Sequence, residues 1–176
     1  MGERSYLDYN ASAPLAVPCK KSMVEAMAFL GNGSAIHFEG RQVRSLIEKA
    51  REKIAVAIDA EPEDVIFTSG ATESASLILK EREQLCSPVE HSCVACWCEK
   101  SLSVSKNGKV MVDDSTKSCV QLANSETGIL QRQPTGLFMS DIVQAVGKIK
   151  FSFKKSGIKS AIISAHKFGG PPGIGA

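Results

Sequence analysis

Short apolar runs alternate along this chain with segments whose apolar residues recur at helical spacing, and this alternation restricts the fold more than any other feature. The spacing predicts helices over residues 18–30, 39–58 and 72–85, and it is most regular over 39–58. The apolar runs predict short strands at residues 65–67, 109–112, 119–122, 136–139 and 161–163. Strands alternating with helices favour an α/β domain, with a mostly parallel sheet flanked by helices.

The composition fits one soluble domain and excludes several classes of function. The chain has 176 residues, of which 43% are hydrophobic and 23% charged, so it can bury a sizeable core. The net charge of +2 comes from scattered residues, which argues against a nucleic-acid surface. No apolar run approaches the ~18 residues of a membrane span, and the first residues lack the apolar stretch of a signal peptide. We therefore expect a cytoplasmic protein without nucleic-acid or membrane partners.

Six cysteines are spread unevenly, as free thiols of a reducing compartment would be. His91, Cys93, Cys96 and Cys98 offer four soft metal ligands within eight residues, which makes a zinc or iron-sulfur module one hypothesis. However, structural zinc usually joins two separated ligand pairs, and no second pair follows. The alternative is that these cysteines are small buried hydrophobic residues, and we expect no metal.

The segment of residues 65–73 predicts a strand, a tight turn and the start of a helix. Small residues at Ser69, Gly70 and Ala71 let backbone amides approach an anion, and the helix N-terminus adds positive potential. Thr72 adds a hydroxyl. The turn therefore suits a phosphate, although such turns also occur without a ligand. No P-loop lysine and no dinucleotide-binding glycine pattern follows.

Two further residues suggest cofactor chemistry. Asp141 follows an apolar run, and an acid at the carboxyl end of a strand faces the crevice where open α/β sheets bind ligands. It could pair with a protonated ring nitrogen, or it could cap a helix. Lys167 lies between an apolar run and a glycine-rich turn, where an amine can form a Schiff base, although a solvated loop lysine is the simpler interpretation.

Seven short motifs carry a resemblance to a known family. They occur in order at residues 6–14, 31–37, 67–74, 90–91, 124–128, 141–148 and 164–167. The series resembles the cysteine desulfurases, which are pyridoxal phosphate enzymes of the class V aminotransferase group. The resemblance covers essentially the whole chain and implies that residues 1–176 are an incomplete cofactor-binding large domain of a pyridoxal phosphate-dependent transferase.

The resemblance also implies roles for individual residues. Lys167 resembles the lysine that forms the Schiff base with pyridoxal phosphate and moves protons, and His91 resembles the imidazole stacked on its ring. Asp141 resembles the carboxylate that keeps the ring nitrogen protonated, and Gln144 the donor to the phenolic oxygen. The phosphate end is matched by Thr72, Ser164 and His166, with the backbone of Gly70 and Ala71.

In this family the sulfur of cysteine passes to an enzyme cysteine, which leaves alanine and supplies iron-sulfur cluster or thio-cofactor synthesis. Its members are homodimers, so a homodimer is expected here. The chain departs from the pattern, because the persulfide-forming cysteine, the substrate-binding arginine and the C-terminal small domain have no counterpart. Ser125 stands where the family has asparagine, and the segments 85–90, 112–119 and 131–137 are shorter than in relatives.

Three hypotheses follow. The first is a truncated or degenerate cysteine desulfurase that keeps the cofactor site without full turnover. The second is a non-catalytic scaffold or binding protein of the same fold. The third is a small metal or thiol module that uses residues 91–98.

Overall fold

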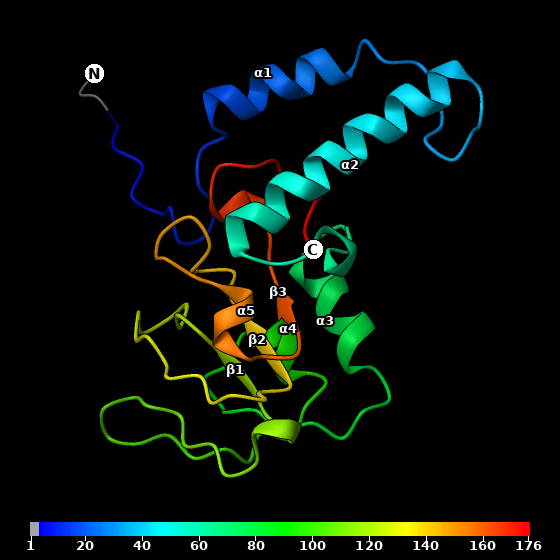
Figure 1. The fold of residues 1–176 in the computed structure, drawn as a ribbon. Helices are drawn as coiled ribbons and strands as arrows, with labels where there is room; N and C mark the ends of the chain where they lie inside the picture. Colours follow the sequence, from blue (N-terminus) through cyan, green and yellow to red (C-terminus); the bar gives the residue numbers. More distant parts are fainter. Residues whose placement is uncertain (1–3) are drawn as a thin grey trace.

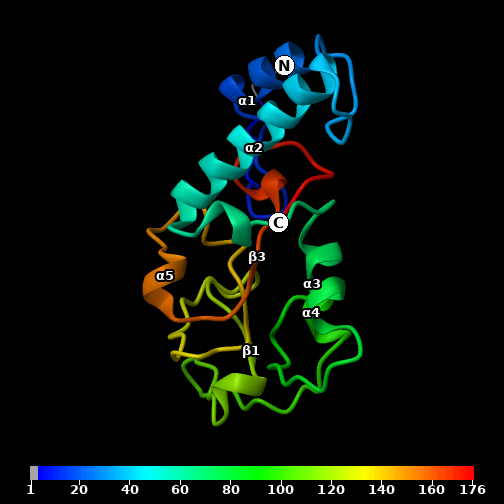
Figure 2. The ribbon, with the colours of Figure 1, turned by 45° about the vertical axis from the view of Figure 1, so that its right-hand side comes forward.

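The computed structural model describes residues 4–176 and shows a small parallel sheet with helices on both faces (Figures 1 and 2). The strands β1 (Cys119–Gln121), β2 (Met139–Asp141) and β3 (Ala161–Ile162) pair in the order β1-β2-β3, and both pairings are parallel. The predicted α/β architecture is therefore confirmed.

Successive residues of a strand point to opposite faces, and both faces of the sheet are buried. On one face, Cys119 and Met139 pack against helices α3 (Ala71–Leu79) and α4 (Ser92–Ala95). On the other face, Val120 packs with residues near helix α5 (Phe153–Ser156). Figure 2 shows α3 and α4 on one side of the strands and α5 on the other.

Two helices extend from this body at the N-terminal end of the chain (Figure 1). Helix α1 (Val17–Ala26) has no buried residue. Helix α2 (Phe38–Ile58) matches its predicted range closely, begins with His37 as its N-cap and ends at Asp59, which adopts a left-handed conformation. Only Gly40 and Ala55 of α2 are buried, so both helices expose most of their surface.

Several predicted strands were wrong or shifted. The segment 65–67 is not a strand, and the chain there pairs only at Thr68, in an isolated bridge to Gly175. The segment 109–112 has only one bridge, between Val110 and Val104. The apolar run 136–139 begins with a turn, and the strand starts at its last residue, Met139. These runs lack a partner segment long enough to form a ladder of backbone hydrogen bonds.

Two predicted helices are shorter than expected. Helix α1 ends at Ala26, four residues before the predicted end. Helix α3 ends at Leu79, because the chain turns at Lys80 and Glu81 and then runs beside β1. There Leu85 forms parallel bridges to both Ser118 and Glu99, so this segment must be extended. Pairing with neighbouring segments thus overrides a local helical preference.

Candidate active site

The glycine turn before α3 is fixed from both sides. Thr68 Oγ1 accepts a hydrogen bond from Gly70 N at 3.3 Å and contacts Ser74 Oγ at 2.8 Å. A Cβ atom on Gly175 would lie 2.7 Å from Gly70 Cα, so the two backbones approach each other as only glycine allows. The predicted phosphate turn therefore exists as a packed structure at the N-terminus of a nine-residue helix.

Asp141 is the last residue of β2, and its carboxyl group is almost completely buried at 2% exposure. Burial raises its pKa from 3.8 to about 6, partly offset by the hydrogen bond from Val143 N and by the charges of His91 and Lys167. Oδ1 accepts that bond at 2.9 Å, as the helix-cap alternative anticipated, although no helix begins here. A buried acid near two basic side chains can pair with a cationic ligand atom.

His91 lies on the turn that precedes α4. Its Nδ1 accepts a hydrogen bond from Cys93 N at 3.2 Å and lies 3.0 Å from Cys93 Sγ. The ring therefore caps α4 and its orientation is set by the backbone. Burial raises the pKa of the Cys93 thiol to about 12, so this sulfur is a protonated partner of the ring and not a thiolate.

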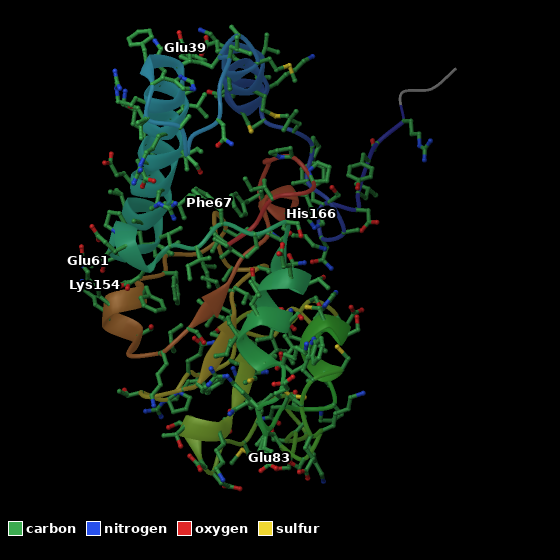
Figure 3. The ribbon with its side chains drawn as sticks, turned by 90° about the vertical axis from the view of Figure 1, so that its right-hand side faces the viewer. Glu39, Glu61, Phe67, Glu83, Lys154 and His166 are labelled. Carbon is green, nitrogen blue, oxygen red and sulfur yellow. The ribbon has the colours of Figure 1, made fainter. Side chains whose placement is uncertain are left out.

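Lys167 ends the short 3₁₀ turn Ala165–Lys167, and its Nζ donates to the carbonyl of Asn10 at 2.9 Å. Gln144 Nε2 donates to the same carbonyl at 2.9 Å, while Lys148 donates to Gln144 Oε1. Figure 3 shows His166 on this C-terminal turn, near the N-terminal end of α3. The pKa of His166 is lowered by burial and by the charge of Lys167, which favours a neutral imidazole.

All nine predicted site residues line one cavity of about 350 Å³, which we call the site cavity. Its predicted members are Gly70, Ala71, Thr72, His91, Asp141, Gln144, Ser164, His166 and Lys167. Hydroxyl groups and helix N–H donors lie at the glycine turn, and a buried carboxyl group lies at the end of β2. This donor set fits a ligand with an anionic group, a basic ring nitrogen and a carbonyl for the lysine, as pyridoxal phosphate has.

The cavity also contains residues that the sequence did not assign to it. They are Glu73, Cys93, Gln121, Val143, Pro172 and Gly173. Ser69 of the predicted phosphate turn and Ser125, at the family's asparagine position, also line the cavity, as the sequence suggested. Glu73 accepts a hydrogen bond from Ser69 N at 2.6 Å, and the capping pattern at the start of α3 could have revealed it. Gln121 carried no sequence signal, because it is a single polar residue within the apolar run 119–122.

The cysteines near His91 do not converge on one point. Cys93 is on the buried side of α4, Cys96 is exposed, and Cys98 is half-buried, with its Sγ 4.0 Å from Cys119 Sγ. Across residues 4–176, no group of three or more His, Cys, Asp or Glu side chains could hold a metal ion. In the same residues, no helix is both long and apolar enough to cross a membrane.

The chain matches the family described as "Aminotransferase class-V" over residues 5–112 and 119–176. It is 37% identical to "Cysteine desulfurase IscS" of Dictyoglomus turgidum, and the match covers 100% of this chain and 54% of the relative. The chain thus spans about half the length of the relative. That alignment extends over 216 positions, so the relative also has internal segments that are missing here.

Solved structures also match nearly all of this chain and somewhat more than half of their own length. A structure described as "NIFS-LIKE PROTEIN" matches with a TM-score of 0.85 and 28% identity, covering 98% of this chain and 58% of the other. A second, described as "SspA in complex with cysteine", matches with a TM-score of 0.85 and 27% identity over 98% of this chain and 60% of the other.

Proposed function

Because the chain belongs to the class V aminotransferase family, we propose that it is the cofactor-binding part of a cysteine desulfurase-like protein and that pyridoxal phosphate is the ligand of the site cavity. One observation carries the proposal. Nine residues chosen from separate segments of the sequence line the same cavity. The names of the relatives support the assignment to cysteine desulfurases within the wider family.

Each group in the cavity has a proposed task. Lys167 supplies the amine for the covalent link, and its bond to the Asn10 carbonyl orients Nζ before binding. Asp141 pairs with the protonated ring nitrogen, and this pairing compensates the cost of its burial. His91 covers the ring, and Gln144 donates to the phenolic oxygen. When bound, the cofactor supplies an electron sink.

The phosphate group is assigned to the glycine turn. Backbone N–H groups at the start of α3, the Thr72 and Ser164 hydroxyls and His166 are the proposed donors. Glu73 already satisfies Ser69 N, so that amide is not available to the phosphate. Gly70 N likewise donates to Thr68 Oγ1, so the amides of Ala71 and Thr72 remain as the backbone donors, and Gly70 contributes the close approach of its backbone.

Substrate, assembly and location are part of the same proposal. Cysteine is the proposed amino-acid substrate of the complete protein, in line with the names of the relatives and with the solved structure described as a complex with cysteine. A homodimer and a cytoplasmic location stay predictions. Cys93 is the cysteine of the site cavity, and because burial raises its pKa to about 12 it is not a thiolate that could accept sulfur. We therefore expect the 176-residue chain to bind cofactor but not to complete sulfur transfer.

The test is reductive trapping of added pyridoxal phosphate. We expect a visible absorbance band, and after borohydride reduction the cofactor should be recovered on the peptide that contains Lys167. Lys167→Ala should abolish both signals. Lys159→Ala is the matched control, because Lys159 is an exposed lysine that lines a different cavity. Attachment to several lysines without preference, or no band at all, would overturn the proposal and favour a scaffold of the same fold.

A further inference from the structure

Glu90 is a buried glutamate that the proposed function does not use. Its side chain is 8% exposed, directly before His91 in the sequence. Oε1 accepts a hydrogen bond from Gln121 N at 2.9 Å. Oε2 is buried without a partner, and so is the neighbouring hydroxyl of Ser87. A buried carboxyl group with one donor needs an explanation, because unpaired buried oxygens are costly.

The surroundings of Glu90 disfavour its ionised form. The charged group that acts on it is Asp141 on β2, and the nearby Cys86 thiol is neutral because its own pKa is raised. The hydrogen bonds from Gln121 N and with Ser87 lower the pKa of Glu90, but burial outweighs them. Burial, followed by the charge of Asp141, raises the pKa of Glu90 to about 8. A carboxylate here would be an unpaired buried charge, whereas a carboxylic acid needs only an acceptor for its proton.

The surroundings also show what Glu90 holds in place. Residues 87–91 form the turn that presents His91, closed by Glu90 N bonding to Ser87 O at 3.2 Å. Glu90 attaches this turn to the backbone of β1, and Asn124 Nδ2 attaches it again by donating to Val89 O at 2.8 Å. The turn is thus bound to β1 and to the loop that follows it.

We propose that Glu90 is a neutral carboxylic acid that positions the His91 turn, with one oxygen accepting from Gln121 N and the other donating its proton to Ser87 Oγ. The two oxygens without a partner belong to residues three apart in the same turn, and a hydrogen bond between them would satisfy both. If Glu90 is neutral, Asp141 is the member of the Glu90–Asp141 pair that is ionised, and its charge acts on the site cavity. The effect of Glu90 on cofactor binding rests on the proposed function, because His91 belongs to the proposed cofactor site.

Carbon-13 NMR of labelled glutamate carboxyl groups tests the protonation directly. We expect one resonance that is missing in Glu90→Gln and that titrates near pH 8 in the unsubstituted chain. If the missing resonance titrates in the ordinary range of exposed glutamates, the proposal is overturned. This measurement needs no cofactor, so its outcome is independent of whether pyridoxal phosphate binds.

Stability provides a second readout. The folded state holds the Glu90 proton more tightly than the unfolded state, so the unsubstituted chain loses stability as pH rises from the unfolded pKa of 4.5 to about 8. Glu90→Gln keeps the acceptor and gains a donor for Ser87 without a charge. Its melting temperature should therefore exceed that of the unsubstituted chain by a margin that grows over this range, reaching at least about 5 °C.

The control is Glu83→Gln, at an exposed glutamate after α3 that Figure 3 labels. The difference in melting temperature between this variant and the unsubstituted chain should stay constant with pH. A constant margin for Glu90→Gln as well would overturn the proposal. For positioning, Glu90→Gln should keep the cofactor dissociation constant within about threefold, whereas Glu90→Asp, which is too short to reach Gln121 N, should weaken it about tenfold. Equal losses in both variants would contradict a positioning role for the neutral acid.

Discussion

Two cavities of about 350 Å³ each adjoin the crossing where Gly175 pairs with Thr68 and Ser164, and they differ in almost every other respect. The site cavity contains a buried carboxyl group, two histidines and a lysine. The second, which we call the apolar cavity, is lined mainly by aliphatic side chains: Ile58, Val65, Ile66, Leu77, Ile78, Ile142 and Ile163 among others. One backbone framework therefore supports two surfaces of opposite chemistry.

The difference is sharpest at two consecutive residues. Asp141 lines the site cavity and Ile142 lines the apolar cavity, and both are essentially fully buried. Burial of Ile142 stabilises the fold through removal of apolar surface from water. Burial of Asp141 destabilises it, because the carboxylate loses hydration. The cost of burying Asp141 therefore offsets part of the stability that burial of Ile142 provides.

The largest expected effect comes from Ile142→Ala. Ile142 belongs to a buried cluster with Ala145 and Ile163, against which Ile54 of α2 packs. Truncation should lower the free energy of unfolding by about 3 kcal/mol, through lost burial and a residual cavity. Denaturant unfolding measures this loss, and pyridoxal phosphate affinity of the folded protein should change by less than about twofold. Ile149→Ala, at a more exposed position, is the control; a large loss of affinity in Ile142→Ala would break the comparison.

Asp141→Asn should have the opposite effect on stability. The folded state holds the Asp141 proton more tightly, so the chain loses stability as pH rises from 3.8 to about 6. Without cofactor, the variant should therefore be more stable by about 3 kcal/mol at pH 7, with almost no gain below pH 4. Its pyridoxal phosphate affinity should fall at least about tenfold. A lower stability of Asp141→Asn at pH 7 would show that burial of the Asp141 carboxylate does not destabilise the fold.

The smallest expected effect is that of Ser125→Asn. Ser125 lines the site cavity where the cysteine desulfurase pattern has an asparagine. A restored amide adds a donor, which should strengthen pyridoxal phosphate binding about fivefold with little change in stability. Spectroscopic titration measures the affinity, with Ser101→Asn at an exposed position as control. An unchanged affinity would mean that the loop at Ser125 does not reach the ligand.

Residue type and position drew attention to Lys167, Asp141 and the glycine turn. The family resemblance was needed to prefer a cofactor role over a solvated lysine, a helix cap and a turn without a ligand, and the roles themselves stay predictions. The convergence of nine residues on one cavity then followed from a parallel sheet, whose carboxyl ends share one edge.

Strand boundaries depend on partners that a local pattern does not contain. The run 65–67 is apolar, but the chain there pairs with another segment only through Thr68 and Gly175. An isolated bridge therefore forms instead of a ladder of hydrogen bonds. Conversely, Lys80 to Gln84 are good helix formers, yet the bridges of Leu85 to Ser118 and Glu99 require an extended chain. Glu90 belongs to the motif at residues 90–91 but received no role from the sequence, because its burial and the missing partner of Oε2 are tertiary properties.

The hydrogen bond between Asn10 and Lys167 joins positions separated by 157 residues, in a chain of 176. A second bond, from Asn10 Nδ2 to Ser125 O, spans 115 residues. Closing such loops carries a large entropic cost before any contact repays it, so these contacts form late in folding. During synthesis Asn10 leaves the ribosome long before Lys167. Cofactor capture would then report that the two ends of this 157-residue span have come together.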